Sequence, residues 1–167
     1  LTHIEWIVTK EKFESNPIHN VDLNGYPISS VCADFMVDEN FVDSQYLNFY
    51  LKPICEMVIH NNIECLTIPL LEKSSVVGDN IRDEFIKVIY PYLNDYIDIN
   101  FLIESELGVD KLKNILSISD NLGITYDTGN ITSFGLNHEL YIESFRDDII
   151  QVHIKDRIIN PLETVIP

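Results

Sequence analysis

Basic residues are scarce in this chain. Its 167 residues include 27 acidic side chains against 11 Lys and Arg, which gives a formal net charge of −16. Binding to nucleic acid or to an anionic membrane surface is driven by clustered Lys and Arg. We therefore expect no nucleic-acid partner and no membrane partner. An acidic surface is common on ordinary soluble enzymes.

Cysteines and long apolar runs are also few. Cys32, Cys55 and Cys65 lie in apolar sequence without C-x-x-C spacing, so we expect buried, reduced thiols and a cytoplasmic protein rather than a disulfide framework or a zinc knuckle. No apolar run approaches the ~18 residues of a membrane span. Gly129 and Gly135 are isolated, so a Walker or dinucleotide loop is not indicated.

Three short apolar runs carry residues that can bind a metal. The runs span residues 100–105, 124–130 and 149–156. Helical-looking sequence separates them, which is typical of parallel strands with crossover helices and functional groups at the carboxyl ends of the strands. Glu104, Asp127 and His153 would then converge as a ligand set for a divalent Mn, Mg, Co or Zn ion. Unrelated polar residues at strand ends are the alternative.

The intervening segments favour helices. Apolar residues recur in them at helical spacing. We expect helices over residues 44–60, 79–94, 109–119 and 137–148.

The three runs resemble strands five, six and seven of the xylose-isomerase-like TIM barrels, a superfamily of sugar-phosphate isomerases and epimerases. Asp-Thr-Gly-Asn at 127–130 and His-Ile-Lys-Asp at 153–156 most resemble the ketopentulose-phosphate 3-epimerase and hexulose-phosphate isomerase branch. Residues 4–7, 29–34 and 65–70 resemble strands two, three and four. The resemblance covers nearly the whole chain in order and implies an α/β fold of the (β/α)8 TIM-barrel type.

The chain is short for this fold, since a full barrel needs about 250 residues. We therefore expect one partial barrel domain over residues 1–167, with approximately strands two to seven and with βα units missing at both ends. Residues 20–26 are also too few for a crossover between parallel strands, which takes a dozen or more. An omitted segment near residues 20–21 would explain this.

The resemblance implies roles for single residues. Glu104, Asp127 and His153 would be three of four metal ligands, and Glu104 would double as an acid/base. The fourth ligand is a glutamate on strand eight of the family. Glu163 does not fit it, because this residue follows His153 by only ten positions and is expected in a loop.

Two further carboxylates are candidates for the mouth of the barrel. Glu5, in the first strand, is expected to point into the mouth or the interior. It would support the site there, or act as an orienting or structural carboxylate. Asp34, at the end of the second strand, is the other candidate.

Four residues are candidates for substrate binding. Asn130 takes a position where related ketose epimerases carry a substrate-binding histidine, so we expect a hydroxyl contact. Glu72 lies in a loop that lines the substrate pocket in the family, with a merely solvated loop as the alternative. Lys155 and Arg157 would be explained by a phosphate on the substrate. A salt bridge to Asp156 or to another acid is the alternative for both.

We therefore expect a metal-dependent sugar or sugar-phosphate isomerase or epimerase that transfers a proton next to a carbonyl through an enediolate. The metal would polarise the substrate oxygens and carboxylates would exchange the proton. Other metal-dependent enzymes on the same barrel stay open, namely an inosose-dehydratase-like lyase and, less in keeping with the acidic charge, an endonuclease-IV-like nuclease. A degenerate barrel that only binds is a further alternative. The expected partner is a small sugar or sugar phosphate, and a homo-oligomer is compatible with the sequence.

Overall fold

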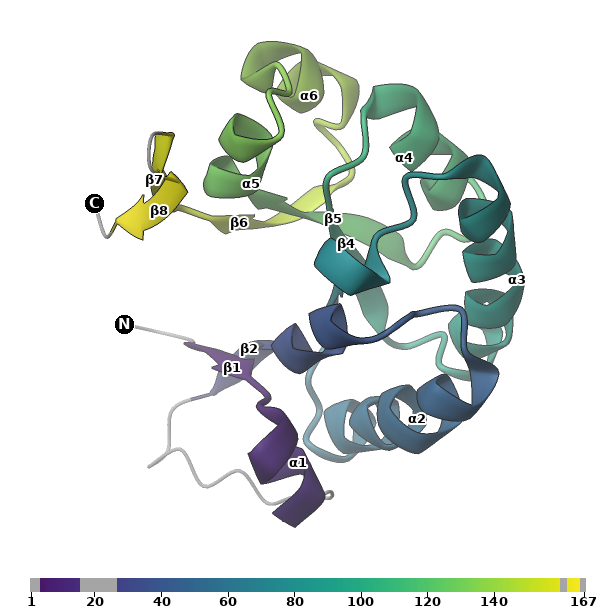
Figure 1. The fold of residues 1–167 in the computed structure, drawn as a ribbon. Helices are drawn as coiled ribbons and strands as arrows, with labels where there is room; N and C mark the ends of the chain where they lie inside the picture. The colour runs from purple at the N-terminus through teal and green to yellow at the C-terminus, as the bar shows by residue number, and fades with distance from the viewer. Residues whose placement is uncertain (1–3, 16–26, 160–161, 166–167) are drawn as a thin grey trace.

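The computed structural model describes residues 4–15, 27–159 and 162–165, of which residues 12, 15, 156–159 and 162–165 are described by their backbone alone. Six strands form one parallel sheet in the order of the sequence. They are β1 (Ile4–Ile7), β2 (Ile28–Cys32), β3 (Cys65–Leu70), β4 (Asn100–Ser105), β5 (Leu122–Asp127) and β6 (Ile149–His153). The sheet curls and helices cover its outer side (Figure 1). The fold is an incomplete TIM barrel, as the sequence predicts.

Helices connect the strands on the outside of the sheet. They are α1 (Lys10–Ser15), α2 (Ser44–His60), α3 (Asp79–Asp95), α4 (Val109–Leu116), α5 (Thr128–Ser133) and α6 (His138–Ser144), with 3-10 turns η1 (Asp34–Asp38) and η2 (Glu72–Ser74). The predicted starts at residues 44, 79 and 109 are correct. The helices predicted over 109–119 and 137–148 are shorter than predicted, since they end at Leu116 and Ser144.

The strands β3, β4 and β5 are buried almost throughout, and all six residues of β5 are buried. This follows from a parallel sheet that has helices on one face and the barrel interior on the other. Gly123 permits the close approach of β5 to β6. A Cβ at this position would lie 2.6 Å from the Ile150 Cδ1 atom and 3.2 Å from the backbone oxygen of Asp148.

The strand register aligns the functional ends of the sheet. Asp127, the last residue of β5, pairs directly with His153, the last residue of β6. In the same way Glu104 of β4 pairs with Pro69 of β3. Parallel strands place their carboxyl ends at one edge, so the polar ends of β4, β5 and β6 meet at the mouth of the half-barrel.

Several expected boundaries differ from the structure. The runs expected to reach residues 130 and 156 end as strands at Asp127 and His153. Glu163, expected in a loop, lies instead in β8 (Leu162–Val165), which pairs antiparallel with β7 (Asp156–Ile159). Within the described residues no further strand joins the six-stranded sheet. The omission expected near residues 20–21 falls outside the described residues.

The three cysteines are free thiols, as expected. Cys32 and Cys55 are buried as expected, whereas Cys65, also expected to be buried, is partly exposed. Burial raises the pKa of the Cys32 and Cys55 thiols far above the ordinary value, so both stay protonated. In the described part of the chain no helix has both the length and the apolar character needed to cross a bilayer.

Candidate metal centre

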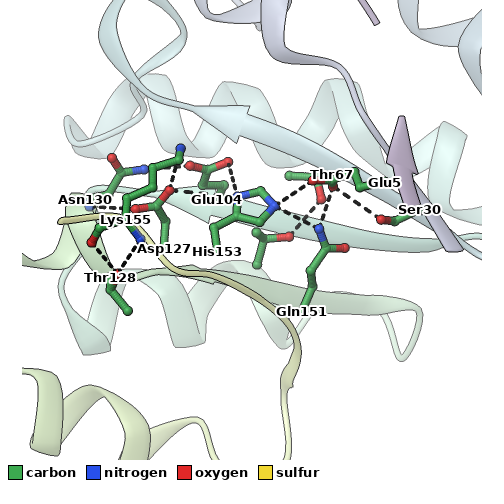
Figure 2. A network of polar contacts seen from close by, with 11 residues as sticks. Glu5, Ser30, Thr67, Glu104, Asp127, Thr128, Asn130, Gln151, His153 and Lys155 are labelled. Carbon is green, nitrogen blue, oxygen red and sulfur yellow. Dashed lines mark hydrogen bonds and ion pairs between the residues drawn. The ribbon is translucent and has the colours of Figure 1, made fainter. Parts of the chain in front are cut away.

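Glu104, Asp127 and His153 converge at the mouth of the half-barrel (Figure 2). The His153 Nδ1 atom lies 3.7 Å from the Glu104 Oε2 atom and 3.8 Å from the Asp127 Oδ2 atom. One ligand atom from each residue lies within 4.8 Å of the other two. Glu104 and Asp127 are buried, with exposures of 5% and 2%. The geometry thus brings together the three residues that the sequence singles out, and their role as ligands stays a prediction.

Asn130 holds the two carboxylates in this arrangement. Its backbone N–H donates to the Asp127 Oδ1 atom at 2.9 Å, because Asp127 is the N-cap of α5. Its side-chain Nδ2 donates to the Glu104 Oε1 atom at 2.7 Å. Each carboxylate therefore uses one oxygen for Asn130 and turns the other toward His153.

The His153 imidazole lies between Glu5 on one side and Glu104 and Asp127 on the other (Figure 2). Its Nε2 atom lies 2.9 Å from the Glu5 Oε2 atom, and its Nδ1 atom is buried without a hydrogen-bond partner among the described residues. Burial alone lowers the pKa of His153, but the hydrogen bond to Glu5 and the charges of Glu5 and Glu104 outweigh burial and raise it above its ordinary value. A buried imidazole nitrogen that faces two carboxylate oxygens fits a divalent cation.

The surroundings of the two buried carboxyl groups shift their pKa values in opposite directions. Burial raises the pKa of Glu104 to about 7; the charge of Asp127 adds to this effect, whereas Lys155 and His153 oppose it. For Asp127, burial raises the pKa, but the hydrogen bonds from Lys155 and Asn130 more than offset it, so the net shift is downward. Two carboxyl groups with opposite shifts are typical of acid/base sites. Asp127 stays ionised and Glu104 can take up or release a proton near neutral pH.

Lys155 contributes a cation to this cluster. Its Nζ atom lies 2.7 Å from Asp127 Oδ2, the oxygen that also faces His153. Thr128 fixes the backbone of Lys155, since its hydroxyl oxygen accepts from the Lys155 N–H at 2.9 Å and lies 2.7 Å from the Lys155 carbonyl. The salt bridge to another acid, one of the two alternatives for Lys155, is therefore present.

A hollow of about 360 Å³ opens beside these residues. Among its lining residues are Asp34, Glu72, Glu104, Asn130 and Lys155. The backbone of Glu72 has a φ of +52°, in the left-handed region that non-glycine residues rarely adopt. Such strain gathers at functional sites. Asp34 thus lies at the mouth as expected, whereas the Arg157 side chain lies outside what the structure describes.

Sequence reasoning missed two residues near His153. Gln151 lies two positions before it on the same face of β6, and its Nε2 atom lies 2.8 Å from the His153 Nε2 atom. Ser30 of β2 donates to the Glu5 Oε1 atom at 3.3 Å. The period of two along a strand is the signal that marks Gln151. No local signal marks Ser30, because its contact depends on how β1 pairs with β2.

The fold occurs in solved structures of the xylose-isomerase-like TIM barrels. A xylose isomerase domain protein from Planctomyces limnophilus matches with a TM-score of 0.72 and 12% identity over 98% of this chain and 71% of that chain. A D-tagatose 3-epimerase-like protein matches with 0.68 and 20% identity over 94% and 68%. An IOLI protein with a bound zinc atom matches with 0.67 and 18% identity over 93% and 63%. A family 2 AP endonuclease from Brucella melitensis shares the fold too.

These likenesses establish the fold and leave the reaction open, because all identities are at or below 20%. The chain spans 63–71% of the length of the first three structures. No protein-family model matches the chain, and neither does a curated protein.

Proposed function

We propose that this chain is a metal-dependent isomerase or epimerase that acts on a sugar or a sugar phosphate. The observation that carries the proposal is the set of three oxygen and nitrogen donors at the strand ends. The Nδ1 atom of His153 is buried without a hydrogen-bond partner in the described part of the chain, and it faces one oxygen each of Glu104 and Asp127. The similar fold of a xylose isomerase domain protein and of a D-tagatose 3-epimerase-like protein supports the assignment.

Glu104, Asp127 and His153 would hold the divalent ion, which we expect to be Mn, Mg, Co or Zn. Carboxylate and imidazole donors suit such ions, and three protein ligands leave positions open for a substrate. The zinc atom in the IOLI structure supports a metal on this fold. When bound, the ion would polarise the carbonyl and hydroxyl oxygens of the substrate.

Glu104 would carry the proton. In the metal-free protein burial raises the pKa of its carboxyl group to about 7. With an ion bound, this pKa would be lower and the carboxylate ionised, ready to accept a proton. Glu104 would remove the proton from the carbon next to the carbonyl and return it to the substrate. Isomerisation on one face of the substrate needs a single such group. Epimerisation needs a second donor on the opposite face.

The substrate would enter the hollow beside Glu104. Asn130, Glu72 and Lys155 line it and would contact hydroxyl groups or a phosphate. A divalent ion bound to Asp127 would compete for the oxygen that Lys155 now holds. The Lys155 ammonium could then turn toward a substrate phosphate, with Arg157 as a second candidate. We propose a cytoplasmic location on the basis of the free thiols.

The test is metal binding together with proton exchange on the purified protein. We would remove metal with a chelator, add back Zn²⁺ or Mn²⁺, and follow deuterium incorporation from solvent into a panel of ketoses and ketose phosphates by NMR. Exchange that requires the metal and disappears in Glu104→Gln supports the proposal. Glu143→Gln, at an exposed position of α6, is the matched control and should keep full activity.

Absence of metal binding by the wild-type chain would overturn the metal-dependent assignment and favour a barrel that only binds. Metal binding with cleavage of abasic-site DNA, and no sugar exchange, would favour the nuclease. The net charge of −16 argues against that outcome.

A further inference from the structure

A polar cluster joins the two edge strands of the half-barrel behind His153. Glu5 of β1 contacts both Gln151 and His153 of β6, which are 146 and 148 positions away in the sequence. The Glu5 Oε2 atom lies 2.9 Å from the His153 Nε2 atom. The Glu5 Oε1 atom accepts from the Gln151 Nε2 atom at 2.5 Å and from the Ser30 hydroxyl at 3.3 Å.

We propose that Glu5 is a positioning residue that keeps the proton of His153 on the Nε2 atom. With the proton there, the Nδ1 lone pair faces Glu104 and Asp127 and is available to a divalent ion. This inference deepens the proposed function and rests on it for the identity of the ligand. Glu5 contacts the Nε2 side of His153, away from the Nδ1 atom that faces Glu104 and Asp127, and it does not line the hollow beside Asn130.

Two partners compete for the His153 Nε2 atom, and they favour opposite tautomers. The Glu5 carboxylate can only accept, so it favours a proton on Nε2. The Gln151 amide nitrogen, 2.8 Å away, is a donor and would favour a proton on Nδ1. A hydrogen bond to an ionised carboxylate is about twice as strong as one between neutral groups. In addition, Glu5 engages the same amide nitrogen through its other oxygen.

The surroundings of Glu5 hold it in the orientation that this role needs. Its side chain is 20% exposed and that of His153 is 16% exposed. Ser30 pairs with Glu5 in the β1–β2 register, so its hydroxyl lies beside the carboxylate. Outer carboxylates of this kind set the orientation of a metal-binding histidine, and their loss typically lowers metal affinity ~10–100-fold.

The test uses one readout without metal and one with Zn²⁺ as the probe. Long-range ¹H–¹⁵N NMR on the metal-free protein, at a pH above the raised pKa of His153 so that the ring is neutral, reports which nitrogen carries the proton. A competition titration against a zinc chelator at the same pH reports the affinity. In the wild type we expect the Nε2–H form. Glu5→Gln should shift the ring toward the Nδ1–H form and weaken Zn²⁺ binding by ~10–100-fold. Glu11→Gln, at an exposed position of α1, is the control and should change neither.

Wild-type tautomer and wild-type affinity in Glu5→Gln would overturn the inference. Gln151→Met provides a second test that is independent of how well Glu5→Gln folds. It removes the competing donor, so the Nε2–H form and the Zn²⁺ affinity should be retained, and a shift to the Nδ1–H form would contradict us. If the wild type binds no Zn²⁺, the proposed function fails, whereas the metal-free tautomer still decides the role of Glu5.

Discussion

Replacing Glu104 by Gln should stabilise the metal-free protein at alkaline pH while it removes the proposed activity. The Glu104 carboxyl group is buried and has a pKa of about 7, against an ordinary value of 4.5. Below pH 4.5 this carboxyl is protonated in both the folded and the unfolded chain. As the pH rises from 4.5 to 7 the unfolded chain releases the proton more readily, so the stability contributed by the protonated group is lost.

The size of the effect follows from the gap between the two pKa values. A gap of about 2.5 pH units at 1.36 kcal/mol per unit amounts to about 3 kcal/mol at pH 8. Glutamine keeps an oxygen for Asn130 and carries no charge, so Glu104→Gln removes this loss. For a chain of this size we expect a melting temperature roughly 6–12 °C higher than the wild type at pH 8. At pH 4.5 the two proteins should melt together.

Thermal melts between pH 4.5 and pH 8, with a chelator in every sample, measure this difference. Comparison with the wild type cancels the titration of groups that do not interact with Glu104, and Glu143→Gln controls for the loss of one exposed acid. If the difference in melting temperature between Glu104→Gln and the wild type does not change over this pH range, burial does not raise the pKa of Glu104. The assignment of Glu104 as the proton carrier would then lose its physical basis.

Three further substitutions probe the site and the sheet. Lys155→Met removes an ammonium that lies 2.7 Å from Asp127, so zinc should bind about fivefold more tightly in a chelator competition, the equivalent of ~1 kcal/mol for a partly exposed pair. Asn130→Ala takes the buried donor from Glu104 and should cost roughly 1.5–3 kcal/mol in urea unfolding at pH 8. Gly123→Ala places a Cβ 3.2 Å from a backbone oxygen and 2.6 Å from a side-chain carbon of Ile150, and should cost ~1–3 kcal/mol in the same assay. Wild-type values in these assays would contradict the respective contact.

The sequence predicts the strand order and the meeting of three site residues for a simple reason. A parallel sheet brings all carboxyl ends to one edge, so Glu104, Asp127 and His153 must converge if each ends a strand. The boundary at Asp127 was available from the sequence too. Asp-Thr-Gly-Asn carries a good N-cap residue at Asp127, and the helix α5 begins directly after it.

The sequence alone does not predict which side chains meet across the interior of the half-barrel. Glu5 meets Gln151 and His153 because the sheet curls until its two edge strands face each other. The amount of curl is set by packing over the whole sheet, and periodicity in a single strand does not encode it. The partner of Lys155 could not be predicted from the sequence either. Lys155 reaches Asp127 because Thr128 fixes the backbone of the loop that carries it.

The charges around His153 give a separate argument for a divalent ion. Three carboxylates, Glu5, Glu104 and Asp127, lie within 4 Å of the imidazole nitrogens. Lys155 is the one ammonium that the structure describes in ion-pair contact with them. With a neutral imidazole and ionised acids, two negative charges stay uncompensated at a largely buried site, which is costly. The metal-free protein can lower this cost by keeping a proton on Glu104, and the raised pKa of Glu104 is consistent with this. A bound divalent ion would compensate both charges and displace the protons that Glu104 and His153 hold at pH 6, because both pKa values are raised. Zinc binding at pH 6 should therefore liberate more than one proton per ion, measurable by calorimetry in buffers of different ionisation enthalpy.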